Sequence, residues 1–92
     1  MPQVHRLSDP NVAQGVILGI PQSTVFANGK LISVNGSMVS PHEPFIDPHD
    51  NALTANGSST VFIGGIPVNR QGDADTCGHP RASGSADVFV GG

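Results

Sequence analysis

The sequence predicts an all-β fold made of short strands and tight turns, and three observations lead to this expectation. Val and Ile together number 16 in 92 residues, against 4 Leu, and β-branched side chains favour strands over helices. Gly and Pro together number 20, and no ten-residue stretch free of them carries a helical apolar stripe. The third observation is a short strand-like phrase that the chain repeats.

The repeated phrase is an apolar, β-prone run that ends in Gly, so each copy is typical of a strand that enters a turn. Its three copies cover residues 23–29, 59–65 and 86–92. One Phe holds the same place in every copy: Phe26, Phe62 and Phe89. Three copies in so short a chain indicate an architecture of pseudo-threefold strand repeats.

The first copy belongs to a series of predicted strands. Residues 15–19 form a short apolar strand, residues 23–27 the next one, and residues 30–34 a third. Asn28 and Gly29 separate the last two, and both residue types tolerate the positive φ that a two-residue hairpin turn needs. A β-hairpin is therefore expected at this position.

The second copy follows the first at an offset of 36 residues and predicts a second hairpin. Gly64 and Gly65 take the turn, and Pro67 marks the return strand as an edge or interrupted strand. The third copy holds only the first strand of the unit, because the sequence stops where the turn would be. Residues 1–14 are expected to be an irregular leader outside the repeats, with His5 as a solvated side chain.

Composition and charge exclude several classes of function. A net charge of −3 with only 4 Lys and Arg leaves no basic patch for nucleic acid. No run of about 18 apolar residues could span a membrane, and the first residues lack the apolar core of a secretory signal. We therefore expect a protein made in the cytoplasm without a signal peptide. It is expected to form one domain over residues 1–92, with no effector extension at either end.

A core of this size and low aromatic content needs further stabilisation from a disulfide, a metal or a partner. The single Cys excludes an internal disulfide. Four side chains could bind a metal, and they form two pairs that follow the first and the second repeat: His42 and His49, then Cys77 and His79. A fold that brings equivalent repeat ends together would bring the pairs together, and one thiolate with three imidazoles suits tetrahedral zinc.

The sequence leaves the role of such a metal open. Four protein ligands would complete the tetrahedron and leave no place for a catalytic water. If one of the four is not a ligand, the alternative is a small metal-dependent enzyme or toxin with an open zinc site in the 41–50 and 77–79 region, where Glu43 or Asp50 would be the general base. A metal-free β-adaptor with scattered His and Cys is the third interpretation. The Asp residues of this part are expected to shape Asx turns: Asp47, Asp50, Asp73 and Asp75.

Taken together, these motifs resemble those of the PAAR-repeat proteins. The shared residues are the two phrases at 23–29 and 59–65, Gly72-Asp73 after the second phrase, and the segments 76–80 and 84–92. The resemblance covers about residues 8–92. PAAR-repeat proteins form the sharpened tip on the spike of type VI secretion systems and related contractile phage tails.

The resemblance implies a fold, a cofactor and a partner. The fold would be a small cone of β-strands whose tip is closed by one structural zinc. Its three His and one Cys ligands match four positions residue by residue: His42, His49, Cys77 and His79. The base would sit as a monomer on a trimeric β-helical spike, VgrG-like or from a phage tail. The implied role is mechanical: the tip helps the spike to pierce an envelope, without stable membrane insertion, and travels with it out of the cell or within a virion.

Overall fold

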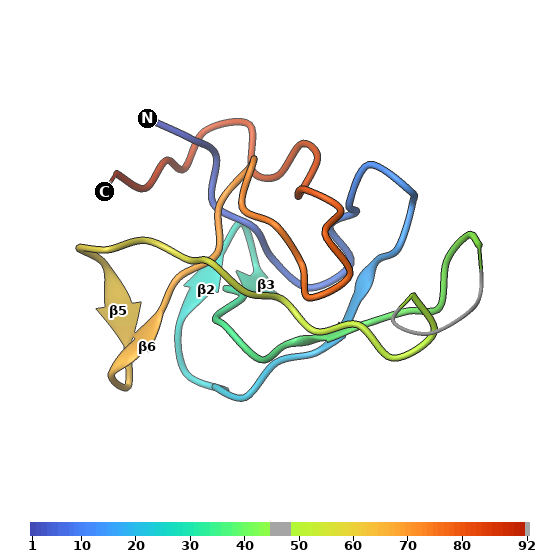
Figure 1. Cartoon of the computed structure of the whole chain (residues 1–92). Helices are drawn as coiled ribbons and strands as arrows, with labels where there is room; N and C mark the ends of the chain where they lie inside the picture. Colours follow the sequence, from blue (N-terminus) through green and yellow to red (C-terminus); the bar gives the residue numbers. More distant parts are fainter. Residues whose placement is uncertain (45–48, 92) are drawn as a thin grey trace.

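The computed structural model describes residues 1–44 and 49–91, and this part of the chain contains no helix (Figure 1). It contains six short strands, which pair two by two into antiparallel sheets. The pairs are β1 (Ile17–Gly19) with β4 (Met38–Val39), β2 (Phe26–Ala27) with β3 (Lys30–Leu31), and β5 (Phe62–Ile63) with β6 (Ile66–Pro67). The predicted all-β class is confirmed. Within the described ranges, no helix is long and apolar enough to cross a membrane.

Both predicted hairpins are present. β2 and β3 enclose Asn28 and Gly29, whose φ angles are 54° and 77°. β5 and β6 enclose Gly64 and Gly65, whose φ angles are 59° and 79°. Positive φ at both central residues is the geometry of a type I′ turn, whose twist matches the twist of the flanking strands. Local turn chemistry therefore determines the register of each hairpin.

β4 is the strand that the sequence does not predict. It pairs with β1, which lies inside the predicted strand 15–19, and the register is irregular: Ile17 faces Val39 and Gly19 faces Met38. On its other side Met38 forms a bridge with Leu53. β4 thus connects two distant segments before the chain enters the loop that carries His42.

The third repeat is completed by the other end of the chain. Gln3 pairs with Phe89 in the place where Leu31 pairs with Phe26 in the first repeat. The backbone N–H of Val4 donates to the carbonyl of Val88 at 3.0 Å. The N-terminal segment therefore takes the place of the return strand in the third repeat, through isolated bridges. Our prediction of an irregular leader outside the repeats was wrong.

Three equivalent residues join the repeats in a closed ring of backbone hydrogen bonds. The N–H of His5 donates to the carbonyl of Asn69 at 3.1 Å, that of Asn69 to Ser33 at 2.9 Å, and that of Ser33 to His5 at 2.9 Å. All three residues are 0% exposed. We call this arrangement the backbone ring. It gives the fold a pseudo-threefold centre, and each repeat contributes one residue to it.

A tight turn follows each residue of the backbone ring. In all three, the N–H of the fourth residue donates to the carbonyl of the first: Asp9 to Arg6, Ser37 to Val34 and Asp73 to Arg70. In the first and third turns the side chains also form an ion pair, with 2.9 Å from Arg6 Nε to Asp9 Oδ2 and 3.0 Å from Arg70 Nη2 to Asp73 Oδ1. The shared Arg-x-x-Asp pattern is a sequence sign that residues 1–14 belong to the repeat system.

The core lies between the repeats and is aliphatic. Its buried members are Val4, Ala27, Val34, Val68 and Val90, with Ile20, Ile32, Ile63, Ile66 and Val88 packed around them. In each repeat the residue directly after the shared Phe is directed into this core. Because successive side chains of a strand point to opposite faces, the shared Phe is directed outward. Phe26, Phe62 and Phe89 are 56%, 49% and 46% exposed.

His5 is buried, so the prediction of a solvated side chain was wrong. Its backbone is part of the backbone ring, and its Nε2 lies 2.7 Å from the carbonyl oxygen of Ala82. Burial lowers the pKa of His5 below its usual 6.5, and the hydrogen bond to Ala82 opposes this only partly. The folded protein therefore keeps His5 neutral at a pH where the unfolded chain already binds a proton.

This pKa difference predicts acid sensitivity of the fold. As the pH falls below about 6.5 toward the lowered pKa of His5, the unfolded state gains protons first, so the free energy of unfolding decreases. Urea unfolding of metal-free protein between about pH 7.5 and 5.5 measures the slope. We expect a smaller slope for His5→Gln, which retains a donor for Ala82. Equal slopes for the two proteins would contradict this assignment.

Val4 offers a direct test of the closed third repeat. Val4 is 0% exposed and Val12, eight positions later, is 59% exposed. Val4→Ala is expected to cost about 2 kcal/mol of unfolding free energy, because it removes two buried methyl groups and leaves a cavity. Val12→Ala should cost less than about 0.5 kcal/mol. Denaturant unfolding of the two variants measures the difference, and an equally mild effect at both positions would show that the leader is not part of the core.

Candidate metal centre

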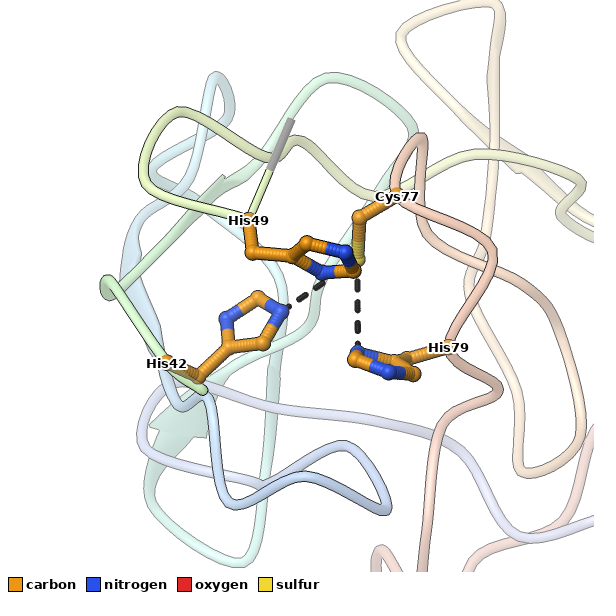
Figure 2. Close-up of side chains that lie close together, drawn as sticks. All are labelled: His42, His49, Cys77 and His79. Carbon is orange, nitrogen blue, oxygen red and sulfur yellow. Dashed lines mark hydrogen bonds between the residues drawn. The ribbon is translucent and has the colours of Figure 1, made fainter. Parts of the chain in front are cut away.

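Two short segments carry the four candidate ligands. His42 lies just after β4, and its N–H donates to the carbonyl of His49 at 3.3 Å, so the two His face each other across one loop. Cys77 and His79 lie in a turn that is closed by a 2.9 Å bond from the N–H of Asp75 to the carbonyl of His79. Figure 2 shows the four side chains pointing toward one another from these segments. The structure thus brings together all four residues that the sequence singled out.

The distances within this group suit one shared metal ion. The four ligand atoms all lie within 4.8 Å of one another. His42 Nε2 is 3.3 Å from Cys77 Sγ, and Cys77 Sγ is 3.7 Å from His79 Nδ1. Tetrahedral zinc bound to one sulfur and one nitrogen would hold these two atoms about 3.5 Å apart. The observed separations lie on both sides of that value.

A contact outside the candidate ligand set already orients one of the imidazoles, and a second imidazole has a buried nitrogen without a partner. Nδ1 of His42 lies 2.9 Å from the carbonyl oxygen of Ser40. When Nδ1 carries the proton and donates it to this oxygen, Nε2 has a free electron pair, and Nε2 is the atom that faces Cys77. Ser40 is held in turn, because its Oγ accepts the N–H of Val16 at 2.9 Å. Nδ1 of His49 is buried and has no hydrogen-bond partner among the described residues. A buried nitrogen without a partner is explained if a metal binds it.

The electrostatics favour the neutral form of His79, which is the form that binds metals. The ring centres of the three His lie 4.8–5.4 Å apart. Burial lowers the pKa of His79, and the neighbouring imidazoles of His49 and His42 lower it further. A metal bound here would connect the segments that carry His42 and His49 to the 77–79 turn.

A family model describes this sequence: the model for the PAAR motif matches residues 7–83. The chain belongs to the PAAR-motif family. No curated protein matches the sequence. The family is structural and supplies the spike tips of type VI secretion systems and phage-like injection machines, where it associates with VgrG-like spikes. The suspected resemblance is therefore confirmed.

The predicted roles of the Asp residues in this PAAR protein are correct only in part. Asp73 does stabilise a turn, but not an Asx turn: its Oδ2 accepts the N–H of Arg70, three residues earlier, at 2.8 Å. Asp75 does not act as a simple turn residue, and that expectation was wrong: its Oδ2 lies 2.8 Å from Nη2 of Arg81 in a buried ion pair. Asp50 is exposed, and Asp47 lies outside the described residues.

The structure also shows residues near the candidate metal centre that sequence reasoning missed. Gly15 packs against the His42 ring so closely that a Cβ atom there would lie 2.6 Å from Nδ1. Asn11 and Arg81 are almost completely buried next to it. The sequence of the PAAR protein held no local signal for these three, because their spacing to the ligands has no repeat equivalent.

Proposed function

We propose that this PAAR protein is a single-chain tip that caps the blunt end of a trimeric β-helical spike and sharpens it for penetration of an envelope. In this proposal one structural zinc, bound by His42, His49, Cys77 and His79, fixes the tip. The role is mechanical and not catalytic. The family supports the spike-tip role in general, and features of this chain support the specific arrangement.

One observation carries the capping proposal: the exposed Phe side chains at the same position of three repeats. Phe26, Phe62 and Phe89 are all about half exposed, although large aromatic side chains are costly to leave in water. The backbone ring relates their repeats by a pseudo-threefold arrangement. Three similar aromatic anchors around one axis match a partner that offers three identical subunits. A monomer on a trimer is the stoichiometry that follows.

The candidate metal centre lies far from the β5–β6 hairpin. In Figure 1 the β5–β6 hairpin and both chain termini lie on the left, and the green segment that leads toward His42 lies on the right. Spike contact on the hairpin side would leave the metal centre pointing outward. Zinc is suited to that place, because the donor set contains the thiolate and imidazoles that structural zinc prefers. In this proposal the protein is delivered on the spike, to the outside of the cell or within a virion, as the family suggests.

The experiment that tests the capping proposal measures stoichiometry with the spike. The zinc-loaded chain is mixed with a VgrG-like trimeric spike protein from the same organism, and the complex is analysed by light scattering after size-exclusion chromatography. We expect one chain per spike trimer. Three chains per trimer, or no complex with a folded spike, would contradict the proposal.

The rival function, a small metal-dependent enzyme, requires an open position on the metal. Replacement of zinc by cobalt(II) distinguishes the two, since four protein ligands and three protein ligands plus water give different absorption spectra. A spectrum of four-coordinate cobalt with one thiolate and no exchangeable water supports the structural role. A bound exchangeable water would favour the enzyme.

A further inference from the structure

A buried polar cluster of Asn11, Asp75 and Arg81 lies next to the candidate metal centre. The three residues are 2%, 3% and 2% exposed, and the side chains of Asp75 and Arg81 have no exposed surface. Nη2 of Arg81 donates to Asp75 Oδ2 at 2.8 Å, and Nδ2 of Asn11 donates to the same oxygen at 3.0 Å. We call these three residues the buried clamp.

The buried clamp holds the segment behind His42. Asn11 Oδ1 accepts the N–H groups of Ala13 and Gly15, both within 2.9 Å. The carbonyl of Gly15 accepts from the N–H of Asn11 at 2.8 Å and from Nη2 of Arg81 at 3.3 Å. Gly15 is thus fixed on both of its peptide groups. Because it also touches the His42 ring, its position determines how far that ring can tilt.

The buried clamp also holds the turn that carries Cys77 and His79. The N–H of Asp75 donates to the carbonyl of His79, and the carbonyl of Asp75 accepts the N–H of Gly78, both at 2.9 Å. The side chain of Asp75 is the one bound by Asn11 and Arg81. The carboxylate of Asp75 therefore connects the Asn11–Gly15 segment, which contacts His42, to the turn that carries Cys77 and His79.

Stability alone does not account for this cluster. Burying two opposite charges removes both from water, and well-packed apolar residues in their place are often as stable or more stable. The network is also incompletely satisfied, since Asp75 Oδ1 and Arg81 Nε have no hydrogen-bond partner within the described part of the chain. What a charged network provides, and an apolar cluster does not, is fixed directions for the groups attached to it.

We propose that the buried clamp of Asn11, Asp75 and Arg81 positions the metal ligands before the metal binds, so that it sets metal affinity separately from its effect on fold stability. The inference rests on the proposed zinc site. Asn11, Asp75 and Arg81 act through Gly15 and the 75–79 turn, and none of them is itself a ligand. Partners behind metal ligands commonly change metal affinity about 10–100-fold when they are removed.

The test removes both charges of the clamp and retains its volume. Asp75→Leu combined with Arg81→Met leaves no uncompensated buried charge. The control is Asp73→Leu combined with Arg70→Met. This double change removes the Arg70–Asp73 ion pair, which is not part of the buried clamp. Zinc affinity is measured by competition with a chromophoric chelator, cobalt(II) spectra report ligand geometry, and thermal unfolding of metal-free protein reports the fold.

We expect the clamp variant to bind zinc about 10–100-fold more weakly than the wild type and to show an altered cobalt spectrum. The control should keep the wild-type spectrum and bind within about twofold, whatever its thermal stability. Wild-type affinity and an unchanged spectrum in a folded clamp variant would overturn the positioning role. A wild type that binds neither zinc nor cobalt would instead refute the proposed zinc site, and the positioning role with it.

Gly15→Ala provides a second test if the clamp variant does not fold. Gly15 does not have a left-handed φ, so Ala is compatible with its backbone, and only the contact with His42 and Asn11 is changed. We expect weaker zinc binding with an altered cobalt spectrum. Unchanged affinity and spectrum in folded Gly15→Ala would overturn the proposal.

Discussion

Removal of the metal from the loaded protein is expected to lower its melting temperature by at least about 12 °C. Structural zinc sites have apparent binding free energies of about 10–16 kcal/mol, which is comparable to the whole stability of a small domain. Even if only about 3 kcal/mol of this appears as folding stability, the shift is about 12–24 °C for a chain of this length. Thermal unfolding monitored by circular dichroism, with and without a strong chelator, measures it.

Cys77→Ser separates metal loss from other effects of the chelator. The variant lacks the sulfur atom that lies 3.3 Å from His42 Nε2 and 3.7 Å from His79 Nδ1, so it should melt near the temperature of the chelated wild type and respond little to chelator. Ser83→Ala, an exposed change four positions after His79, is the control and should behave as the wild type. An unchanged melting temperature after both chelation and Cys77→Ser would refute the structural metal.

The second large effect concerns the spike. Replacement of Phe26, Phe62 and Phe89 by Ser together is expected to abolish measurable binding to the trimeric spike. Buried aromatic anchors commonly contribute about 2 kcal/mol or more each, so each single change should weaken binding about 30-fold. Because the three positions are equivalent around the pseudo-threefold axis, the three single variants should lose similar amounts. Biolayer interferometry against immobilised spike measures these affinities.

Exposed apolar residues elsewhere provide the matched control. Met38 and Leu53 form a bridge outside the hairpin repeats and are 58% and 39% exposed. Met38→Ser with Leu53→Ser should leave spike affinity within about twofold of wild type. The folding of the triple Phe variant is checked by its melting temperature. Full spike binding by a folded triple variant would exclude the Phe face as the contact surface.

The sequence predicted what depends on local chemistry. Asn28-Gly29 and Gly64-Gly65 need no distant partner to form their turns, since residue type alone permits positive φ there. The four candidate ligands were found because His42 and Cys77 follow equivalent repeats, and the fold does bring these ends together. The first inference used residue types at adjacent positions, and the second used a repeat at an offset of 36 residues.

What the sequence did not reveal depends on contacts between distant and dissimilar segments. Gln3 has no resemblance to Leu31 or Pro67, yet all three lie opposite the shared Phe of a repeat. The backbone determines that pairing, so side-chain patterns do not show it. Arg81 and Asp75 likewise have no distinctive sequence context. Their pairing is visible only in the fold, which buries both side chains next to each other.

The backbone ring has a consequence for the order in which the protein can fold. Val4 and His5 are made among the first residues, but their partners include Val88 and Asn69. A nascent chain therefore holds residues 3–5 without these partners until residues 88 and 89 have been synthesised. Long-range contacts of this kind slow folding, because loop closure must come before they form. The domain is thus expected to complete its fold only after residues 88 and 89 have left the ribosome, in one late step that joins them to residues 3–5.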